Sequence, residues 1–271
     1  MSVDSPAPVR QGNPLVVALL VVIAILLAVI AGILVTRDDR SAPAQTAATV
    51  STDPSAAAAT DPGAAASAAP TDPATSEPSQ TDPAVLEILH AEVSRDPEDP
   101  RAQGAVDAPV VMVLYSDFSC PYCTQLAQEV EPELADLVEA GTLRIEWRDL
   151  AQVSATSPLA AQAGIAAANQ GMFWEFHDAV YAAADPTGHP EYTEESLIEL
   201  ARAAGVPDIE QFTADMNDPA TVQAVTEATQ HAQQIGIDGT PFMIINDAYI
   251  PGYQPAEYVR ATIEEQAAAA Q

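Results

Sequence analysis

Lysine is absent from this 271-residue chain, and basic side chains of any kind are scarce. All nine basic residues are arginine, against 39 aspartate and glutamate residues, and the formal net charge is −30 at pH 7. A surface of this sign repels phosphate backbones and anionic lipid head groups. The composition therefore argues against a nucleic-acid-binding protein and against a protein that binds acidic membranes through a basic patch.

Cysteine is nearly absent as well, because the chain holds only Cys120 and Cys123. A C-x-x-C pair can supply half of a zinc site, but a structural zinc ion takes four ligands. The four histidines are scattered singly along the chain: His90, His177, His189 and His231. Redox chemistry is the preferred interpretation of the pair, and a zinc site or a purely structural pair are the alternatives.

Local patterns place the two cysteines between a strand and a helix. Residues 110–115 are apolar and rich in β-branched side chains, as in a buried strand, and residues 116–119 read Ser-Asp-Phe-Ser, which predicts a turn. Beyond Cys123, apolar residues recur every three or four positions as far as Val138, as on one face of a helix. Pro121 suits the first helical position, because its missing N–H would have no partner there.

The start of a helix is a reactive environment for a thiol. Cys120 falls at the N-cap, where free backbone N–H groups and the helix dipole favour the thiolate and can lower a cysteine pKa to roughly 3.5–7.5. Cys123 lies one turn further on and is more covered. We therefore assign Cys120 as the nucleophile and Cys123 as the resolving thiol of a dithiol–disulfide exchange site.

The N-terminal part carries one long apolar run. A short polar tail, residues 1–14, precedes Leu15–Val35, which contains no charged or polar side chain and is long enough to cross a bilayer. We predict a transmembrane helix at 15–36 that acts as a signal anchor. A cleaved signal peptide is the alternative, since Ala42-Pro43-Ala44 has a small-x-small form. Arg10 before the run and Arg37 and Arg40 after it do not settle the orientation.

Residues 37–83 consist mostly of Ala, Pro, Thr, Ser and Asp, and Thr-Asp-Pro recurs in them at uneven spacing. Such a segment cannot bury enough apolar surface to fold, so we predict a disordered linker. We place the folded domain at residues 84–271.

Within that domain the patterns alternate between strand and helix. The expected order is β-α-β, a helical insertion at about 152–237, and β-β-α. Strands are predicted at 102–106, 110–115, 143–148, 242–245 and 248–250. Helices are predicted at 84–95, at 120–141 with a kink at Pro132, and at 158–170, 172–184, 193–204, 208–216, 219–235 and 255–266.

Three stretches in this order resemble the DsbA-like branch of the thioredoxin fold, the thiol:disulfide oxidoreductases of the bacterial envelope. They are residues 115–123 (Tyr-Ser-Asp-Phe-Ser-Cys-Pro-Tyr-Cys), residues 170–178 (Gln-Gly-Met-Phe-Trp-Glu-Phe-His-Asp), and Gly-Thr-Pro-Phe at 239–242 continuing to Ile-Pro-Gly at 250–252. The Cys-Pro-Tyr-Cys motif alone is also similar to that of glutaredoxins. The resemblance implies an α/β thioredoxin fold with a helical insertion between its βαβ and ββα halves.

The resemblance also implies roles for further residues. Pro241 would be a cis proline lying against the reactive disulfide, and the backbone of Thr240 would present its polar groups to an extended substrate. Tyr122 occupies a position where strong oxidases of this family carry histidine, and tyrosine supplies no positive charge to stabilise the Cys120 thiolate. Asp117 either tunes the thiol or serves as a turn residue.

These features predict a membrane-anchored enzyme whose C-terminal domain is extracytoplasmic, because stable disulfide formation belongs outside the cytosol. No cofactor beyond the Cys120–Cys123 disulfide is expected. The expected partners are exported proteins with free thiols and a membrane redox partner, either a quinone-linked oxidase or an electron donor. The alternatives are an envelope reductase for a dedicated client and a non-catalytic, tethered binding or chaperone-like module.

Overall fold

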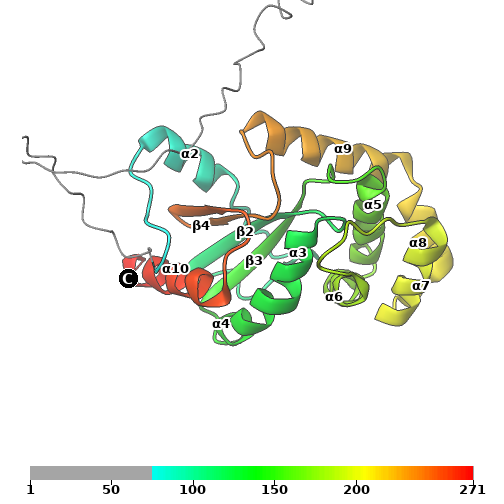
Figure 1. Ribbon diagram of the computed structural model, residues 1–271, viewed down its shortest axis with the longest axis horizontal. Coiled ribbons are helices and arrows are strands. Elements are labelled where there is room, and N and C mark those ends of the chain that lie inside the picture. Colours follow the sequence, from blue (N-terminus) through cyan, green and yellow to red (C-terminus); the bar gives the residue numbers. More distant parts are fainter. Residues whose placement is uncertain (1–74, 271) are drawn as a thin grey trace, which may run out of the picture. The chain divides into compact units, whose positions relative to one another are not determined.

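The computed structural model describes residues 75–270, and its centre is a five-stranded sheet with the strand order β1-β3-β2-β4-β5 (Figure 1). The strands are β1 (Ala102–Gln103), β2 (Val110–Ser116), β3 (Leu143–Asp149), β4 (Phe242–Ile245) and β5 (Ala248–Pro251). Strands β2 and β3 are parallel, whereas β4 is antiparallel to β2 and pairs with β5 as a hairpin. The predicted order β-α-β, helical insertion, β-β-α is confirmed.

Helices cover the sheet and form the insertion between β3 and β4. The helical elements are α2 (Pro83–Ala91), α3 (Pro121–Gln125), η1 (Leu126–Val130), η2 (Glu131–Leu134), α4 (Ala135–Glu139), α5 (Ser157–Ala168), α6 (Phe173–Ala183), α7 (Glu194–Ala204), α8 (Ile209–Met216), α9 (Pro219–Gln234) and α10 (Ala256–Ala269). Each helix predicted within residues 84–271 is present, with ends that differ by a few residues. Helix α2 stops at Ala91 instead of Arg95, and Arg95 itself has a positive φ of 50°.

The helix that begins after Cys120 is irregular in its middle. The α-helical α3 gives way to the π-helical η1 and the 3₁₀-helical η2 before α4 resumes the α-helix. Pro132 lies in η2 and has no N–H to donate to the preceding turn, which breaks the regular hydrogen-bond pattern there. The kink predicted at this proline is confirmed.

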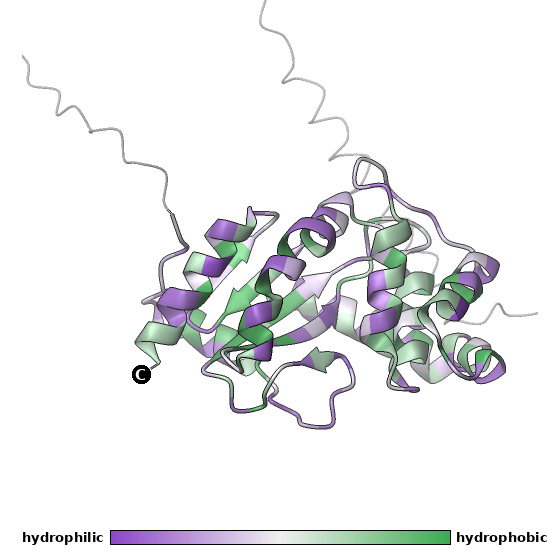
Figure 2. Cartoon of the chain, turned by 90° about the horizontal axis from the view of Figure 1, so that it is seen from below, coloured by the Kyte–Doolittle hydropathy of each residue, from purple (hydrophilic) through white to green (hydrophobic). Residues whose placement is uncertain are grey.

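Alternate residues of the central strands pack into two hydrophobic cores, one on each face of the sheet. Met112 and Leu114 face the larger core, which includes the helices that follow β2 and β3, whereas Val111 and Val113 face a smaller core with Leu89 of α2. Figure 2 shows the central strands as mostly hydrophobic and the outer helix faces as hydrophilic. A strand with two covered faces explains why residues 110–115 form an uninterrupted apolar run.

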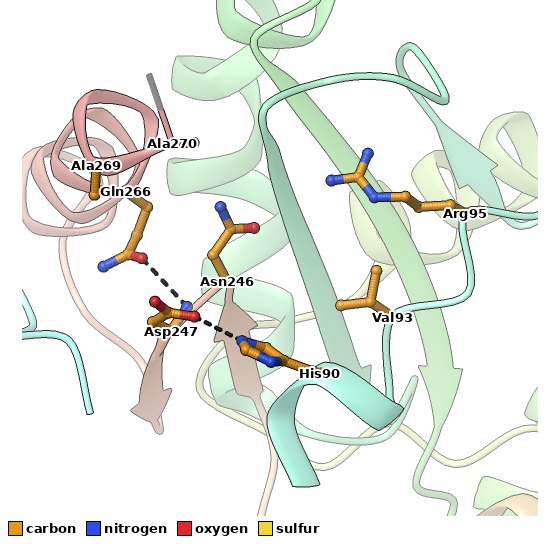
Figure 3. A pocket seen from close by; sticks show the side chains of 8 residues that line it. All are labelled: His90, Val93, Arg95, Asn246, Asp247, Gln266, Ala269 and Ala270. Carbon is orange, nitrogen blue, oxygen red and sulfur yellow. Dashed lines mark hydrogen bonds and ion pairs between the residues drawn. The ribbon is translucent and has the colours of Figure 1, made fainter. Parts of the chain in front are cut away.

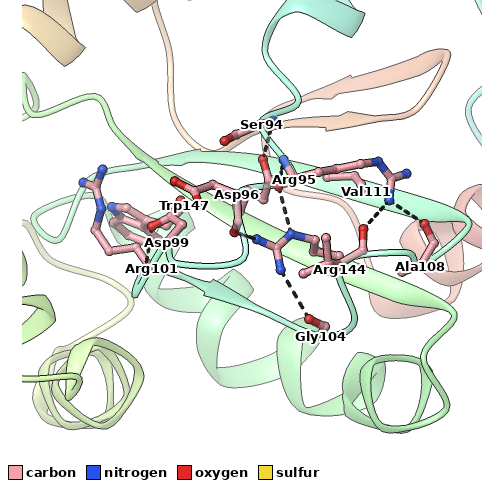
Figure 4. Close-up of polar contacts among 12 residues, drawn as sticks. Ser94, Arg95, Asp96, Asp99, Arg101, Gly104, Ala108, Val111, Arg144 and Trp147 are labelled. Atoms are coloured by element: carbon pink, nitrogen blue, oxygen red, sulfur yellow. Dashed lines mark hydrogen bonds and ion pairs between the residues drawn. The ribbon is translucent and has the colours of Figure 1, made fainter.

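Strand β3 alternates between apolar and polar residues, yet both of its faces are buried. Its polar side chains Arg144 and Glu146 are 3% and 0% exposed, so the second face of this strand is also buried. The Glu146 carboxylate accepts hydrogen bonds from Arg144 Nε at 2.9 Å and from the backbone N–H groups of Ser94 and Arg95. Arg144 also donates to the carbonyls of Asp96 and Gly104 (Figure 4). This buried ion pair and its hydrogen bonds to backbone groups hold the segment before β2 against the sheet.

Gly104 ends β1 for a steric reason. Its φ is +91°, and a Cβ at this position would lie 2.3 Å from the carbonyl oxygen of Leu143. Only glycine allows the backbone to pass β3 so closely. The edge strand predicted at 102–106 is therefore confined to Ala102–Gln103.

The end of the segment assigned to the linker is part of the folded domain, which corrects the boundary between residues 83 and 84. The backbone N–H of Glu77 donates to Thr262 Oγ1 on α10 at 2.8 Å, and that of Gln80 donates to the carbonyl of Asp247 at 2.7 Å. Low apolar content did not exclude ordering here, because backbone donors supply the contacts. The tail at 1–14, the anchor at 15–36 and the linker as far as residue 74 lie outside the described residues. Within residues 75–270 no helix combines the length and apolar character needed to cross a membrane.

Candidate active site

The two cysteines lie where sequence places them, at the beginning of the helical run that follows β2. Cys120 is the N-cap of α3 with extended backbone angles, φ −87° and ψ 122°, and Pro121 is the first helical residue. Cys120 is 4% exposed and Cys123 is 1% exposed. Both are free thiols, so the structure represents the dithiol form of the site.

The surroundings of Cys120 favour its thiolate. A hydrogen bond from the Cys123 thiol is the largest influence, and together with the Thr240 hydroxyl and the backbone N–H groups of Tyr122 and Cys123 it lowers the pKa of Cys120 from 9.0 to about 6. Burial acts in the opposite direction and is outweighed. Cys120 therefore has the character of an attacking and leaving thiol at neutral pH.

Cys123 has the opposite character. Burial raises the pKa of the Cys123 thiol well above its usual value, and its hydrogen bond to Cys120 raises it further. The Ser116 hydroxyl and the backbone N–H of Asp117 offset part of this rise. Of the two thiols, Cys120 therefore ionises first, and Cys123 stays protonated.

Thr240 and Pro241 lie beside Cys120. The peptide bond between them is cis, and the Cys120 thiol donates to the Thr240 carbonyl at 3.4 Å. The Thr240 hydroxyl is buried and, among the described residues, has no hydrogen-bond partner, which leaves it free to donate to a thiolate. The fold thereby brings Thr240 to the sulfur of Cys120, although the two residues are 120 positions apart in the sequence.

Asp117 is buried and organises the loops under the site. Its Oδ1 accepts from the backbone N–H of Ser119, and its Oδ2 accepts from those of Gln152 and Val153, each at 2.8 Å. Within the described residues no hydrogen bond joins this carboxylate to either sulfur. This arrangement ties the turn after β2 to the turn after β3. It favours a role for Asp117 as a turn residue over a role in tuning the thiol.

A groove of about 630 Å³ opens over Cys120. Tyr122 stands at its edge with 58% of its surface exposed, so it presents an aromatic face to the solvent and no charge to the sulfur. The groove is lined by Cys120, Pro121, Tyr122, Gln125, Gln152, Val153, Pro186, Thr187, His189, Asp238, Gly239 and Thr240.

Eight of these lining residues were not among the predicted site residues: Gln125, Gln152, Val153, Pro186, Thr187, His189, Asp238 and Gly239. Gln152 and Val153 follow β3, and since the carboxyl ends of adjacent parallel strands meet at one edge of a sheet, this loop could have been placed at the site from sequence. Thr187 and His189 belong to the loop between α6 and α7, and no local pattern indicates that this loop reaches Cys120.

A second hollow lies away from the cysteines. It has a volume of about 390 Å³ and is bordered by His90 of α2, by Asp247 at the hairpin turn and by Gln266 of α10 (Figure 3). His90 Nε2 lies 2.7 Å from Asp247 Oδ1, and Asp247 N donates to Gln266 Oε1. Its polar groups are largely paired with one another. Within residues 75–270 no group of three His, Cys, Asp or Glu side chains could hold a metal ion.

Comparison with known proteins gives consistent matches. The family model described as Thioredoxin matches residues 96–265. The probable disulfide bond formation protein D of Bacillus anthracis is 29% identical over 148 residues, which cover 53% of this chain and 68% of that protein. The solved structure of oxidised BdbD from Bacillus subtilis superposes with a TM-score of 0.57 at 23% identity, covering 62% of this chain and 92% of BdbD.

Other relatives are much longer than the matched region. The Na⁺/H⁺ antiporter NhaA 3 of Salinispora tropica is 32% identical over 162 residues, or 59% of this chain, and the chain spans about a quarter (23%) of that antiporter's length. The match thus concerns one part of the antiporter, and it carries no argument for ion transport.

Proposed function

Since the chain belongs to the thioredoxin family, we propose that it is a membrane-tethered thiol-disulfide oxidoreductase that forms or exchanges disulfides in exported proteins through Cys120 and Cys123. The observation that carries this proposal is the pairing of two thiols: Cys120 lines an open groove and has a pKa lowered to about 6, and its partner Cys123 is buried behind it at 1% exposure. Relatives named for disulfide bond formation support the same chemistry.

The exchange proceeds in two steps in the oxidising direction. A client thiolate attacks the Cys120 sulfur of the enzyme disulfide, the Cys120–Cys123 bond breaks, and Cys123 takes the electron pair and a proton. A second client thiolate then attacks the client sulfur of the mixed disulfide, and Cys120 leaves as a thiolate. The low pKa of Cys120 makes it a good leaving group in the second step.

The groove explains how a polypeptide would be held during these steps. Gly239 and Thr240 supply backbone groups beside Cys120, and an extended client segment can pair with them as an added strand. The rest of the lining is mostly uncharged, with His189 and Asp238 as the titratable exceptions besides Cys120 and Tyr122. Such a surface suits clients of varied sequence.

The cellular setting forms part of the proposal. The apolar run at 15–36 would anchor the chain in the cell membrane by a single pass, with the domain on the extracytoplasmic side, where disulfides persist. The enzyme dithiol would be reoxidised by a quinone-linked membrane oxidase, or kept reduced by a membrane electron donor.

Tyr122 is the specific observation that favours a reductase as the second candidate. It lies between the cysteines, is largely exposed and brings no charge that would stabilise the Cys120 thiolate. The same residues would then run the exchange in the opposite direction, and the reduction potential separates the two directions.

The test is equilibration of the purified full chain against glutathione buffers, with the thiols trapped by acid and alkylation. A potential toward about −120 mV supports an oxidase, and one toward about −270 mV supports a reductase. Cys120→Ser is expected to abolish oxidation of a dithiol peptide. Full activity in that variant would refute the assignment, and a Cys120 thiol that resists alkylation in the folded dithiol form would favour a non-catalytic binding module.

A further inference from the structure

Cys123 poses a chemical problem that the groove does not solve. Its side chain is 1% exposed, yet each direction of exchange makes it a thiolate for a moment, either as the leaving group or as the attacking group. A buried thiolate without a hydrogen-bond donor is strongly disfavoured. Donors within the protein core must therefore take the place of water.

Two buried hydroxyl groups meet behind Cys123. Ser116, the last residue of β2, and Tyr181 of α6 are each 2% exposed, and Ser116 Oγ lies 3.0 Å from Tyr181 OH. Tyr181 OH also donates to the Asp117 carbonyl at 3.2 Å. The Ser116 side chain also acts on Cys123, because its hydrogen bonding is one of the two influences that lower the pKa of the Cys123 thiol against the effect of burial.

This chain of hydroxyls can point in two directions. When Cys123 is a thiol, its S–H donates to Ser116, Ser116 donates to Tyr181, and Tyr181 donates to the Asp117 carbonyl. When Cys123 is a thiolate, Tyr181 donates to Ser116 and Ser116 donates to the sulfur. The reversal costs only the bond to the Asp117 carbonyl, because each hydroxyl is both donor and acceptor.

We propose that Ser116 and Tyr181 are positioning residues that supply a reversible hydrogen-bond donor to the buried Cys123 thiolate and so set the rate at which Cys123 resolves mixed disulfides. This inference rests on the proposed function, because it concerns the same exchange reaction. Neither residue lines the groove over Cys120, and both act through Cys123.

Other titratable groups surround the pair and belong in any account of its pH dependence. The centroids of the His177 and Tyr181 rings are 4.8 Å apart. The charges of the remaining groups influence the pKa of Tyr181 or the pKa of a group beside it. Those groups are Cys120, Asp117, Glu131 and Asp149. They are unchanged by substitution of either hydroxyl residue.

The resolving step can be isolated with glutathione. The Cys120 thiolate of the dithiol form attacks oxidised glutathione, which gives a mixed disulfide and releases one glutathione. The Cys123 thiolate then attacks the Cys120 sulfur, the bond to glutathione breaks, and the second glutathione leaves with the electron pair. The proton lost by Cys123 is matched by the proton that this glutathione takes up.

The experiment compares the full chain with Tyr181→Phe and Ser116→Ala by mixing the dithiol form with excess oxidised glutathione. Acid-quenched samples are separated by mass into dithiol, mixed disulfide and intramolecular disulfide at several pH values. We expect attack by Cys120 to be unchanged, resolution at pH 7 to slow by about tenfold, and its pH profile to move upward by about one unit. Ser116→Ala repeats the test without touching the aromatic core.

Tyr192→Phe is the matched control. Tyr192 also has a buried hydroxyl, which donates to the Phe118 carbonyl at 2.9 Å and does not contact Cys123 among the described interactions. Its resolution rate should equal that of the wild type. Resolution within twofold of wild type in both Tyr181→Phe and Ser116→Ala, or equal slowing in Tyr192→Phe, would overturn the inference. A wild-type chain that forms no intramolecular disulfide at all would instead refute the proposed function.

Discussion

The pKa of Cys120 yields a quantitative prediction about its partner. The hydrogen bond from the Cys123 side chain is the largest cause that lowers this pKa from 9.0 to about 6. At pH 7 a thiol with a pKa of about 6 is about nine-tenths thiolate, whereas one with a pKa of 9.0 is about one-hundredth thiolate. Replacing Cys123 with alanine removes the donor and leaves the Thr240 hydroxyl and the backbone N–H groups in place.

We therefore expect Cys123→Ala to raise the midpoint of Cys120 titration by at least about one pH unit, which lowers the thiolate fraction at pH 7 to about one half or less. The assay is thiolate absorbance near 240 nm against pH, together with the pH dependence of alkylation of the single remaining thiol. Cys123→Ser is the matched control, because its hydroxyl can still donate, and its midpoint should stay closer to that of the wild type.

The direction of the titration follows from the sign of the shift. Because the pKa is lowered, the thiolate is present at neutral pH and is lost as the pH falls through about 6. A wild-type midpoint near the ordinary value of 9.0, or a Cys123→Ala midpoint within a few tenths of a unit of the wild type, would refute the reasoning.

Two further predictions concern stability and Asp117. The lowered pKa of Cys120 stabilises the folded dithiol form, fully so above pH 9.0, and this stabilisation is lost as the pH falls through about 6. Cys123 stays protonated between pH 6 and pH 9, because its pKa is raised. The free energy of unfolding of the dithiol form should therefore rise by about 1 kcal/mol, relative to that of the disulfide form, between pH 5 and pH 7. Denaturation of both forms at several pH values measures this. A relative free energy of unfolding that falls with rising pH would contradict the predicted sign. Asp117→Ala should lower the free energy of unfolding by about 3 kcal/mol, since one buried and two part-buried backbone N–H groups lose their acceptor. The midpoint of Cys120 titration should move by less than half a unit in the same variant. A shift of a full unit with unchanged stability would instead assign Asp117 to the chemistry.

Much of the fold could be predicted because local patterns carry it. The uninterrupted apolar run of β2 follows from a strand that is buried on two faces. The apolar periodicity after Cys123 follows from a helix that is buried on one face. Pro121 and Pro132 mark the start and the kink of the helical run through the N–H groups they lack. Reading Cys120 as the N-cap therefore required no tertiary information.

The remainder depends on contacts between distant segments. Arg144 and Glu146 look like the solvated face of β3 in sequence, and they are buried because the segment before β2 folds over them. The reach of His189 to the groove is set by the length of the α6–α7 loop and by packing of the insertion. The meeting of Ser116 with Tyr181 joins positions that are 65 residues apart, and no spacing rule links them.

The site where the N-terminal segment joins the domain has a practical consequence. Gln80 is hydrogen-bonded to Asp247, which follows β4, whereas Thr240 of the candidate active site precedes that strand. The contact of the N-terminal segment and the active site therefore lie at opposite ends of β4. At about 3.3 Å per residue this separates them by roughly 15–20 Å. A fluorescent label, a biosensor surface or a fusion partner coupled next to Gln80 would consequently be attached at the end of β4 that lies away from Cys120, and it would leave the groove over the reactive sulfur accessible.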